Sequence, residues 1–250
     1  MSARFTFPEA REWRYIISSL ATLITEANFV VNNEGLRLRA LDPSRAAMVD
    51  LFVPSDAFDE YEVSEEKVSI GVSFDDLEKV MRRSKSDDRV TFEVKEGRLK
   101  VILIGKADRT FSLPLIDIAG EELPTPKVTF NVTAKMMSDT FKDALSDAEL
   151  VSETVKLIGE EEVLKVLARS DRGEVEVKFS LEAGSLLEYE VKEPSTSTYS
   201  IDYLLKVLRK AAKVSDIATL EFSTNMPLSL TFELTGGGQL RFFLAPRVEG

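Results

Sequence analysis

The 250-residue sequence contains no cysteine and no histidine. The lack of cysteine excludes disulfides and thiolate metal sites, and nothing suggests secretion. The lack of histidine excludes Ser-His-Asp triads, histidine-ligated zinc and imidazole proton relays. No apolar run approaches the roughly 20 residues that span a bilayer, and MSARFTFPEA lacks the features of a signal peptide. We therefore expect a soluble, cytoplasmic protein without membrane association.

Phosphate-binding and metal-binding motifs are also missing. There is no GxxxxGK[ST] loop and no GxGxxG after a strand. The glycines of ELTGGGQLRFF lie between two alternating apolar segments, which predicts a hairpin turn rather than a phosphate cradle. The acidic runs Asp75-Asp76, Asp87-Asp88 and Glu160-Glu161-Glu162 could bind a hard cation, but adjacent residues do not face one another, which favours solvated surface. We expect no catalytic residues, no metal and no cofactor, and therefore no enzyme.

One basic segment contrasts with the acidic composition. Asp and Glu number 43 against 32 Lys and Arg, a net charge of −11, while 44% hydrophobic residues suffice for a folded core. The segment IDYLLKVLRKAAK, residues 201–213, has only one acid, Asp202. At about 100° per residue its cations share one side of a helix and its apolar residues the other. The cations are Lys206, Arg209, Lys210 and Lys213; the apolar residues are Leu204, Val207, Leu208 and Ala211.

The same pattern occurs earlier in the chain. FDDLEKVMRRSKSDDRVTFEV begins at Phe74, and at an offset of 127 residues it aligns with IDYLLKVLRKAAKVSDIATLEF. Lys79, Arg82 and Arg83 then match Lys206, Arg209 and Lys210. Because a basic stripe that occurs twice in an acidic protein is hard to explain as ordinary solvated surface, we expect a polyanionic partner.

The front halves of the two copies agree more loosely, and each half predicts a strand, a helix, antiparallel strands, a second helix and more strands. This is an α+β design of two similar domains, with helices packed on antiparallel sheets. LIDIAGEELPTPKV, residues 115–128, predicts an extended linker. We therefore expect domains at 1–116 and 128–250, joined by residues 117–127.

The sequence resembles the sliding DNA clamps of the proliferating cell nuclear antigen family in their archaeal form. The likeness runs essentially end to end and is strongest in GLRLRALDPSRAAMVDLFVPSDAFDEYEV (35–63), RTFSLPLIDI (109–118) and LRFFLAPRVE (240–249). TYSIDYLLKVLRKA and EFSTNMPLSL add to it. The resemblance implies a ring-shaped trimer whose helices line a central hole and encircle double-stranded DNA without reading its sequence.

The resemblance also implies which residues face the DNA. These are Arg14, Lys79, Arg82, Arg83, Lys206, Arg209, Lys210 and Lys213. Tyr15 replaces a cation common beside Arg14, and we assign Lys135 and Lys142 to a third helix whose acids Asp139, Asp143 and Asp147 weaken its positive charge. Two strand-like segments, 109–116 and 174–182, match the edge strands that join neighbouring subunits; ordinary strands within a monomer are the alternative.

A hydrophobic groove that receives client peptides is implied as well. The matching positions are Leu41, Arg45, Ala46, Met48, Leu123, Pro124, Pro227, Phe243, Leu244, Ala245 and Pro246. Arg45 stands where the family often has histidine, and Phe243 and Leu244 could instead belong to the core. The implied partners are DNA polymerase, flap endonuclease, DNA ligase and an ATP-driven clamp loader, at a nucleoid-associated location.

Other interpretations remain open at this point. The chain could be a metal-dependent nuclease built on acidic ligands, or a monomeric scaffold whose basic helices contact acidic proteins. The ring could contain three identical chains or paralogous subunits.

Overall fold

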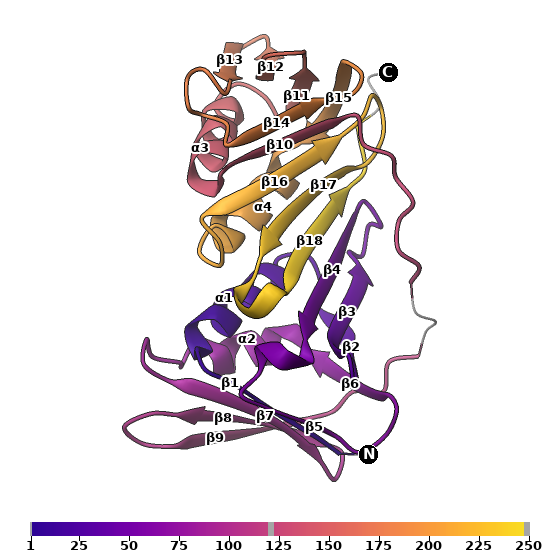
Figure 1. Ribbon diagram of the computed structural model, residues 1–250, viewed down its shortest axis with the longest axis vertical. Coiled ribbons are helices and arrows are strands. Elements are labelled where there is room, and N and C mark those ends of the chain that lie inside the picture. The colour runs from indigo at the N-terminus through magenta and orange to yellow at the C-terminus, as the bar shows by residue number, and fades with distance from the viewer. Residues whose placement is uncertain (1, 120–122, 248–250) are drawn as a thin grey trace. The chain divides into compact units, whose positions relative to one another are not determined.

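The structure, a computed structural model, describes residues 2–119 and 123–247 (Figure 1). The chain folds as two compact units. The first comprises Met1–Pro43, Val49–Leu123 and Glu233–Leu240; the second comprises Ser44–Met48, Pro124–Phe232 and Arg241–Gly250. The predicted pair of α+β domains is confirmed, with a short segment of each half belonging to the other unit.

The α-helices and strands follow the same order in each half of the chain, and only the short 3-10 helices η1 and η2 differ in position. The first half contains β1 (Ala3–Phe7), α1 (Ala10–Ala21), β2 (Glu26–Asn32), β3 (Gly35–Leu41), β4 (Ala47–Pro54), η1 (Ser55–Ala57), β5 (Glu60–Val63), β6 (Val68–Ser73), α2 (Phe74–Met81), β7 (Arg89–Lys95), β8 (Arg98–Ile104) and β9 (Arg109–Pro114). The second contains β10 (Val132–Met137), α3 (Ser138–Glu149), β11 (Thr154–Gly159), β12 (Leu164–Ser170), β13 (Gly173–Phe179), β14 (Glu188–Val191), β15 (Ser195–Ser200), α4 (Ile201–Ala211), β16 (Ile217–Phe222), β17 (Leu228–Glu233), η2 (Thr235–Gly237) and β18 (Gln239–Leu244).

The strands of each unit form antiparallel sheets. In the first unit, one sheet has the order β5-β1-β7-β8-β9, and a second group runs β4-β3-β2-β6. In the second unit, the corresponding groups are β14-β10-β16-β17, with β18 beyond β17, and β13-β12-β11-β15. Buried and more exposed residues alternate along β2, β8 and β11, as expected for sheets with one face buried.

Two helices pack side by side in each unit, α1 with α2 and α3 with α4. In the first unit Trp13 of α1 is fully buried, with its ring 5.1–6.1 Å from those of Phe7, Phe58 and Phe92. Edge and tilted contacts of this kind add to the area that such large rings remove from water. The apolar side of each helix therefore anchors it and leaves the opposite side for solvent.

One four-residue sequence occurs in both halves of the chain and makes similar contacts in each. β5 and β14 both read EYEV, and each pairs antiparallel with the first strand of its half, β1 or β10. The hydroxyl of Tyr61 donates to the Asn32 carbonyl at 2.8 Å, and that of Tyr189 donates to the Glu160 carbonyl at 2.8 Å. Burial raises the pKa of both phenols, that of Tyr189 to about 12, so both stay protonated donors at neutral pH. The duplication extends to individual hydrogen bonds.

The segment that leaves each last sheet strand also docks at an equivalent position. The Ile116 amide donates to the Gly71 carbonyl of β6 at 2.9 Å, and the Arg247 amide donates to the Thr198 carbonyl of β15 at 2.7 Å. Gly71 and Thr198 are 127 residues apart, the offset of the sequence repeat. A Cβ atom on Gly71 would lie 2.0 Å from the Ile116 carbonyl oxygen, so glycine permits the close approach.

The described part of the predicted linker contains no helix or strand. Residues 115–119 and 123–130 are irregular, while 120–122 of the predicted segment lie outside the described residues. Two side chains of the first unit hold this stretch: Asn28 Nδ2 donates to the Ile118 carbonyl at 3.1 Å, and Arg39 Nη1 donates to the Leu123 carbonyl at 2.7 Å. The described part of the linker is therefore hydrogen-bonded to side chains of β2 and β3 rather than simply extended in solvent.

The glycine run forms a turn between β17 and β18 in the chain, as predicted. Gly236 and Gly237 have φ angles of 76° and 82°, the left-handed region that favours glycine. The Leu234 amide donates to the Gly238 carbonyl at 2.9 Å across this turn.

The interpretation of Asp87-Asp88 as solvated surface was wrong for Asp88. Its side chain is 1% exposed and forms an ion pair with Arg109. One of its carboxylate oxygens also accepts from the Lys85 amide at 2.7 Å. Asp88 thus fixes the loop before β7 to the start of β9, because a buried carboxylate requires such partners.

Candidate nucleic-acid interface and peptide groove

The cations of α2 lie on its solvent side, as the helical pattern predicts. Phe74, Leu77, Val80 and Met81 of this helix are buried, whereas Lys79, Arg82 and Arg83 are exposed. The Ser73 hydroxyl caps the helix by accepting from the Asp76 amide at 3.3 Å. The three cations therefore project from a helix fixed at both its start and its apolar face.

The matching helix of the second unit has the same design. In α4 the side chains of Leu204, Val207, Leu208 and Ala211 are buried, which confirms the amphipathic helix predicted for this segment. Lys206, Arg209 and Lys213 are exposed and Lys210 is half-buried. The duplicated cations thus occupy equivalent, solvent-facing positions in their respective units.

Acidic neighbours pair with several of these cations. Within the helices, Lys79 lies 3.3 Å from Asp76, Arg82 lies 2.9 Å from Glu78, and Lys206 lies 2.7 Å from Asp202. Arg209 reaches across to Glu149 of α3 at 2.9 Å. Surface ion pairs contribute only about 0–1 kcal/mol each, so a phosphate can displace these acids at small cost.

Among the predicted DNA-facing cations on α2 and α4 and just after these helices, two make no ion pair with the described residues. These are Arg83 and Lys210, which occupy matching positions in the repeat. The Arg83 carbonyl accepts from Arg109 Nη1 at 2.8 Å, which fixes the backbone at the end of α2 but leaves the Arg83 guanidinium exposed. Arg83 and Lys210 can meet an anion without first losing an acidic partner.

The remaining basic positions differ from the prediction in part. Arg14 lies on α1, half-buried, with its guanidinium carbon 5.8 Å from the centre of the Tyr15 ring. Lys142 lies on α3 and pairs with Asp139. Lys135, however, is on strand β10 and not on a helix, and its ammonium pairs with Glu188 of β14 at 3.2 Å. The assignment of Lys135 to the third helix was wrong because that helix begins only at Ser138.

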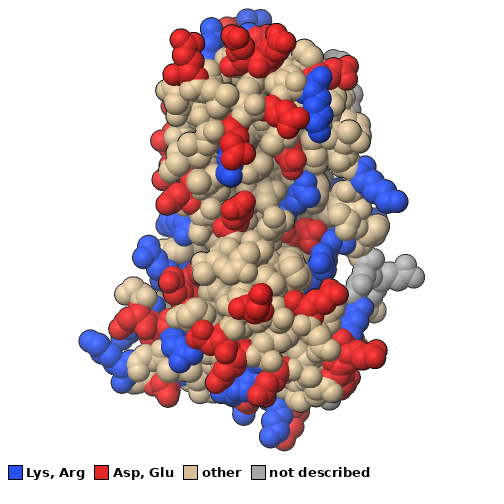
Figure 2. Space-filling model, in the orientation of Figure 1, with Lys and Arg blue, Asp and Glu red and all other residues tan. Residues whose placement is uncertain are grey.

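Charged side chains of both signs intermingle on the face seen in Figure 2. No broad patch of a single sign covers that view. A local basic surface must therefore come from the ordered placement of cations on individual helices, not from the composition of the whole surface.

Most of each predicted edge segment, 109–116 and 174–182, is a strand at the end of its sheet, and the strands stop at Pro114 and Phe179. β9 ends the five-stranded sheet of the first unit, and β13 ends the four-stranded sheet of the second. Exposed and half-buried residues alternate along β9, as they do along most of β13. Their outer backbone groups are therefore available to pair with another strand.

The predicted groove positions belong to both units. In the second unit, the Ala245 amide donates to the Ala46 carbonyl at 2.8 Å, which joins the chain end to the loop before β4. Arg45 in that loop is exposed with a φ of 62°. Met48, Phe243 and Leu244 are 5–7% exposed, so they form a floor rather than an open surface. Ala46, Pro227 and Pro246 are half-buried, and Pro124 and Ala245 are exposed.

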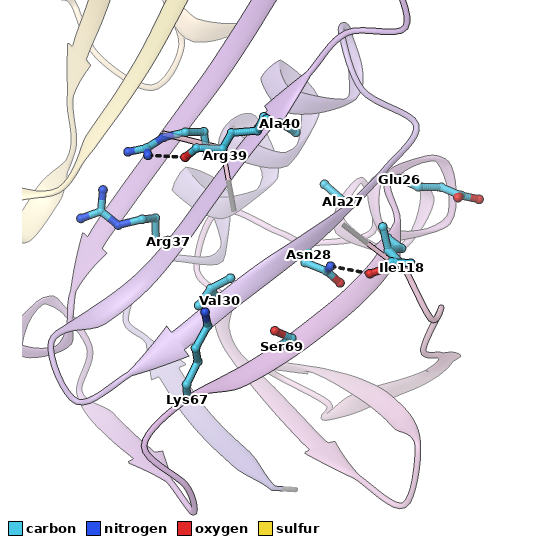
Figure 3. Close-up of a pocket in the computed structure, with 12 residues that line it drawn as sticks. Glu26, Ala27, Asn28, Val30, Arg37, Arg39, Ala40, Lys67, Ser69 and Ile118 are labelled. Atoms are coloured by element: carbon cyan, nitrogen blue, oxygen red, sulfur yellow. Dashed lines mark hydrogen bonds between the residues drawn. The ribbon is translucent and has the colours of Figure 1, made fainter. Parts of the chain in front are cut away.

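In the first unit, Leu41 and Leu123 are half-buried. Leu123 also lines a cavity of about 560 Å³ between β2, β3, β6 and the linker (Figure 3). Arg37, Arg39 and Lys67 line it too, although the sequence prediction did not include them. The alternation of GLRLRAL carried a signal, since residues two apart in a strand share a face.

The described residues also bear on two other classes of protein. No group of three or more Asp and Glu side chains among residues 2–119 and 123–247 is arranged to hold a metal ion. Within the same residues, no helix is long and apolar enough to cross a membrane.

Comparison with known proteins places the chain in a family. The models of the proliferating cell nuclear antigen N-terminal and C-terminal domains match residues 3–119 and 125–247. The chain belongs to the proliferating cell nuclear antigen family. It is 59% identical to the DNA polymerase sliding clamp of Thermofilum pendens over 98% of this chain and 99% of that one. It is 44% identical to sliding clamp 1 of Pyrobaculum aerophilum over 98% of both chains.

Solved structures of the family have the same fold. The crystal structure of PCNA from Thermococcus kodakaraensis matches with a TM-score of 0.93 at 31% identity, covering 98% of this chain and all of that one. A chain of the PCNA2–PCNA3 complex from Sulfolobus tokodaii matches with a TM-score of 0.91 at 31% identity, with the same coverage. The α+β clamp fold predicted from the sequence is therefore confirmed.

Proposed function

We propose that this chain is a subunit of a DNA sliding clamp, a ring that encircles duplex DNA and holds a polymerase on its template. The observation that carries the proposal is the pair of helices α2 and α4, which place cations at equivalent solvent-facing positions in a chain of net charge −11. The names of the relatives, DNA polymerase sliding clamps, support the same function.

The proposed DNA contacts are electrostatic. Arg14, Lys79, Arg82, Arg83, Lys206, Arg209, Lys210 and Lys213 would face phosphates, because long basic side chains bind the backbone without reading bases. Cations whose acidic partners are exposed can exchange one phosphate for the next at low cost, which suits sliding. Retention would come from closure of the ring around the duplex rather than from tight binding.

Ring closure would use the two edge strands. β9 of one subunit and β13 of the next would pair, which would hide backbone groups that otherwise invite aggregation. A chain of 27.9 kDa should then assemble at three times its own mass, alone or with paralogous subunits. Analytical ultracentrifugation tests this step at micromolar concentrations. If the chain sediments as a monomer both alone and in the presence of paralogous chains, the proposed ring is wrong.

Recruitment of clients is the second part of the proposal. Client polymerases, flap endonucleases and ligases would insert a short apolar peptide beside Leu123 and the segment Phe243–Pro246, after a clamp loader has opened the ring. Such a patch, about 400 Å² at 25 cal/mol/Å², gives roughly 10 kcal/mol before association costs of about 4–15 kcal/mol. At most about 6 kcal/mol remains, which corresponds to a Kd of tens of micromolar and allows clients to exchange.

The burial of Phe243 decides how this groove should be tested. Removing a core phenylalanine costs about 3–5 kcal/mol of stability, so Phe243→Ala would confuse folding with binding. Leu123→Ala and Ala245→Asp change half-buried or exposed positions instead. We expect each substitution to weaken the binding of a client-type peptide at least fivefold, as measured by fluorescence polarisation. Unchanged affinity in both variants would remove this groove from the proposal.

An enzymatic function is the alternative from another class. The proposed clamp has no catalytic residue, no metal and no cofactor of its own. Incubation of the purified chain with labelled duplex and single-stranded DNA and Mg²⁺ tests this, and we expect intact DNA. Cleavage that survives further purification and is lost on mutating this chain's acids would contradict the non-catalytic assignment.

A further inference from the structure

Helix α1 carries two arginines and a tyrosine together on its solvent side. Arg11 is exposed, and Arg14 and Tyr15 are half-buried. The guanidinium carbons of Arg11 and Arg14 lie 5.9 Å and 5.8 Å from the centre of the Tyr15 ring. A cation and an aromatic ring attract each other within about 6 Å, so Tyr15 orients both guanidinium groups without neutralising them. The family resemblance assigned Arg14 to the DNA-facing residues but not Arg11.

Arg11 stands where a cation lowers the stability of a helix. It is the second residue of α1, at the positive end of the helix dipole. Arg14 follows three residues later, and like charges at this spacing repel each other. Neither arginine forms an ion pair with the described residues. The acid of this turn, Glu12, is 8% exposed and accepts instead from the Thr235 amide at 2.9 Å. Helix stability therefore does not account for the two arginines.

The matching helix α3 has the arrangement that stabilises a helix. The buried residues of α1 and α3 coincide at an offset of 128 residues, one more than the offset between α2 and α4. At this offset Arg11, Arg14 and Tyr15 match Asp139, Lys142 and Asp143. Asp139 lies in the first turn of α3 and pairs with Lys142. The cation is thus neutralised in α3 at the position where α1 has two cations and no paired acid.

The start of α1 is attached to the segment that follows α2, its neighbour in the first unit (Figure 1). The Ala10 amide donates to the Asp88 carbonyl at 2.9 Å. Arg109 pairs with the Asp88 carboxylate, and its Nη1 donates to the Arg83 carbonyl at 2.8 Å. Arg11 follows Ala10 directly. It is therefore held at the same end of the helix pair as Arg83.

The charges outside ion pairs at this end of the helix pair are mostly positive. Glu9 and Asp87 are exposed acids next to the start of α1 and before β7. The cations there that make no ion pair with the described part of the chain are Arg11, Arg14, Arg83 and Lys85. In a chain of net charge −11, this local surplus of cations favours a polyanionic partner.

We infer that Arg11 is a further DNA-contacting residue and that Tyr15 is a positioning residue, which holds the guanidinium groups of Arg11 and Arg14 toward neighbouring phosphates. Orientation matters because a guanidinium group offers a phosphate two parallel N–H groups in a planar fork. The inference rests on the proposed DNA-binding function and makes the two units unequal. Helix α1 contacts the DNA backbone, whereas α3, with acids at the positions of Arg11 and Tyr15, does not.

Arg11 is tested by fluorescence anisotropy of a labelled duplex with the full chain at several salt concentrations. Arg11→Gln should weaken binding about two- to fivefold and lower the slope of log binding constant against log salt concentration by about 0.9. Arg11→Asp copies the residue of α3. It should lower the slope about twice as much, because the new carboxylate can pair with Arg14.

Lys95→Gln is the matched control for Arg11→Gln, because it removes an exposed cation at the end of β7. It should leave both the affinity and the slope unchanged. If Arg11→Gln binds the duplex like the wild type, or if Lys95→Gln weakens binding as much as Arg11→Gln does, the assignment of Arg11 is wrong.

Tyr15 is tested with two substitutions that leave the charge unchanged. Tyr15→Leu removes the ring and should weaken duplex binding about two- to fivefold, with the salt slope preserved because both arginines remain. Tyr15→Phe keeps the ring and should restore the wild-type affinity. Thermal unfolding checks that both variants are folded. Wild-type affinity in Tyr15→Leu, or equal weakening in both variants, would overturn the positioning role of the ring.

The inference and the proposed function fail in different measurements. If the wild type shows no salt-dependent binding to the duplex, the proposed DNA contacts are wrong and the inference falls with them. If the wild type binds and Arg83→Gln with Lys210→Gln weakens binding while Arg11→Gln does not, the proposed interface stands and only the assignment of Arg11 is wrong.

Discussion

Replacing Gly71 with alanine should release the start of the linker. The added Cβ would lie 2.0 Å from the Ile116 carbonyl oxygen, a backbone atom, and 2.9 Å from Asn28 Oδ1. Since carbon and oxygen do not approach so closely, the linker must shift by about 1 Å or more, a change of the kind that costs about 1–3 kcal/mol. The hydrogen bond from the Ile116 amide, worth about 0.5–1.5 kcal/mol, would break in the process.

Amide hydrogen exchange measures this effect locally. A loss of about 1–3 kcal/mol of protection corresponds to exchange of the Ile116 amide about 5- to 150-fold faster, while the β7–β8 amides stay protected. Ser69→Ala is the matched control, because this change in the same strand removes atoms and adds none. We also expect weaker client-peptide binding in Gly71→Ala, because the linker carries Leu123. Wild-type exchange at Ile116 in Gly71→Ala would refute the reasoning.

Three further predictions concern charges. The double variant Arg83→Gln with Lys210→Gln should weaken duplex binding more than Lys79→Gln with Lys206→Gln, because Lys79 and Lys206 must first leave Asp76 and Asp202. In fluorescence anisotropy at several salt concentrations, the slope of log binding constant against log salt concentration should fall by about 0.9 per phosphate contact removed. The reverse ranking of the two double variants would contradict this reasoning. Glu149→Gln should release Arg209 from its ion pair and tighten duplex binding by about two- to fivefold in the same assay. Weaker binding would contradict this and would mean that Glu149 holds Arg209 in position to contact DNA. For Glu93, burial by itself would raise the pKa, but hydrogen bonds and charge attraction from Arg4 and Lys100 outweigh it and lower the pKa below the ordinary value of 4.5. Its contribution to stability is therefore present above that value and lost as the pH falls through the lowered pKa. Compared with the wild type, Glu93→Gln should have a lower Tm at pH 7 and a smaller fall of Tm below pH 4.5 in thermal unfolding. A fall of Tm below pH 4.5 equal to that of the wild type would contradict this prediction.

Much of the fold follows from local pattern. The 127-residue repeat and the helical spacing of cations and apolar residues predict α2 and α4, because an amphipathic helix is specified by residues three and four apart. The glycine turn is equally local, since Gly236 and Gly237 require positive φ angles. The repeated EYEV strands were missed, although the sequence contains them plainly. Their common role appears only once the tyrosine hydroxyls meet carbonyls about 29 residues away.

The rest depends on contacts between distant residues. Asp88 belongs to an acidic pair in sequence and is buried only because Arg109 reaches it from β9. Glu149 becomes a partner of Arg209 through the packing of α3 on α4. Arg37 and Lys67 line the same cavity because β3 and β6 both flank β2, which strand periodicity alone does not establish. Sequence spacing therefore predicts on which side of a helix or strand a residue lies, but it does not predict which residue contacts it.

Topological retention on DNA tests the central claim most directly. The assembled protein is incubated with a linear duplex, both ends are then blocked with a bulky protein, and retention is measured in 0.5 M salt, where contacts to phosphates are largely screened. A closed ring predicts that protein stays on the blocked duplex and leaves an identical duplex with open ends. Equal loss from both duplexes would contradict encirclement and leave only electrostatic attraction.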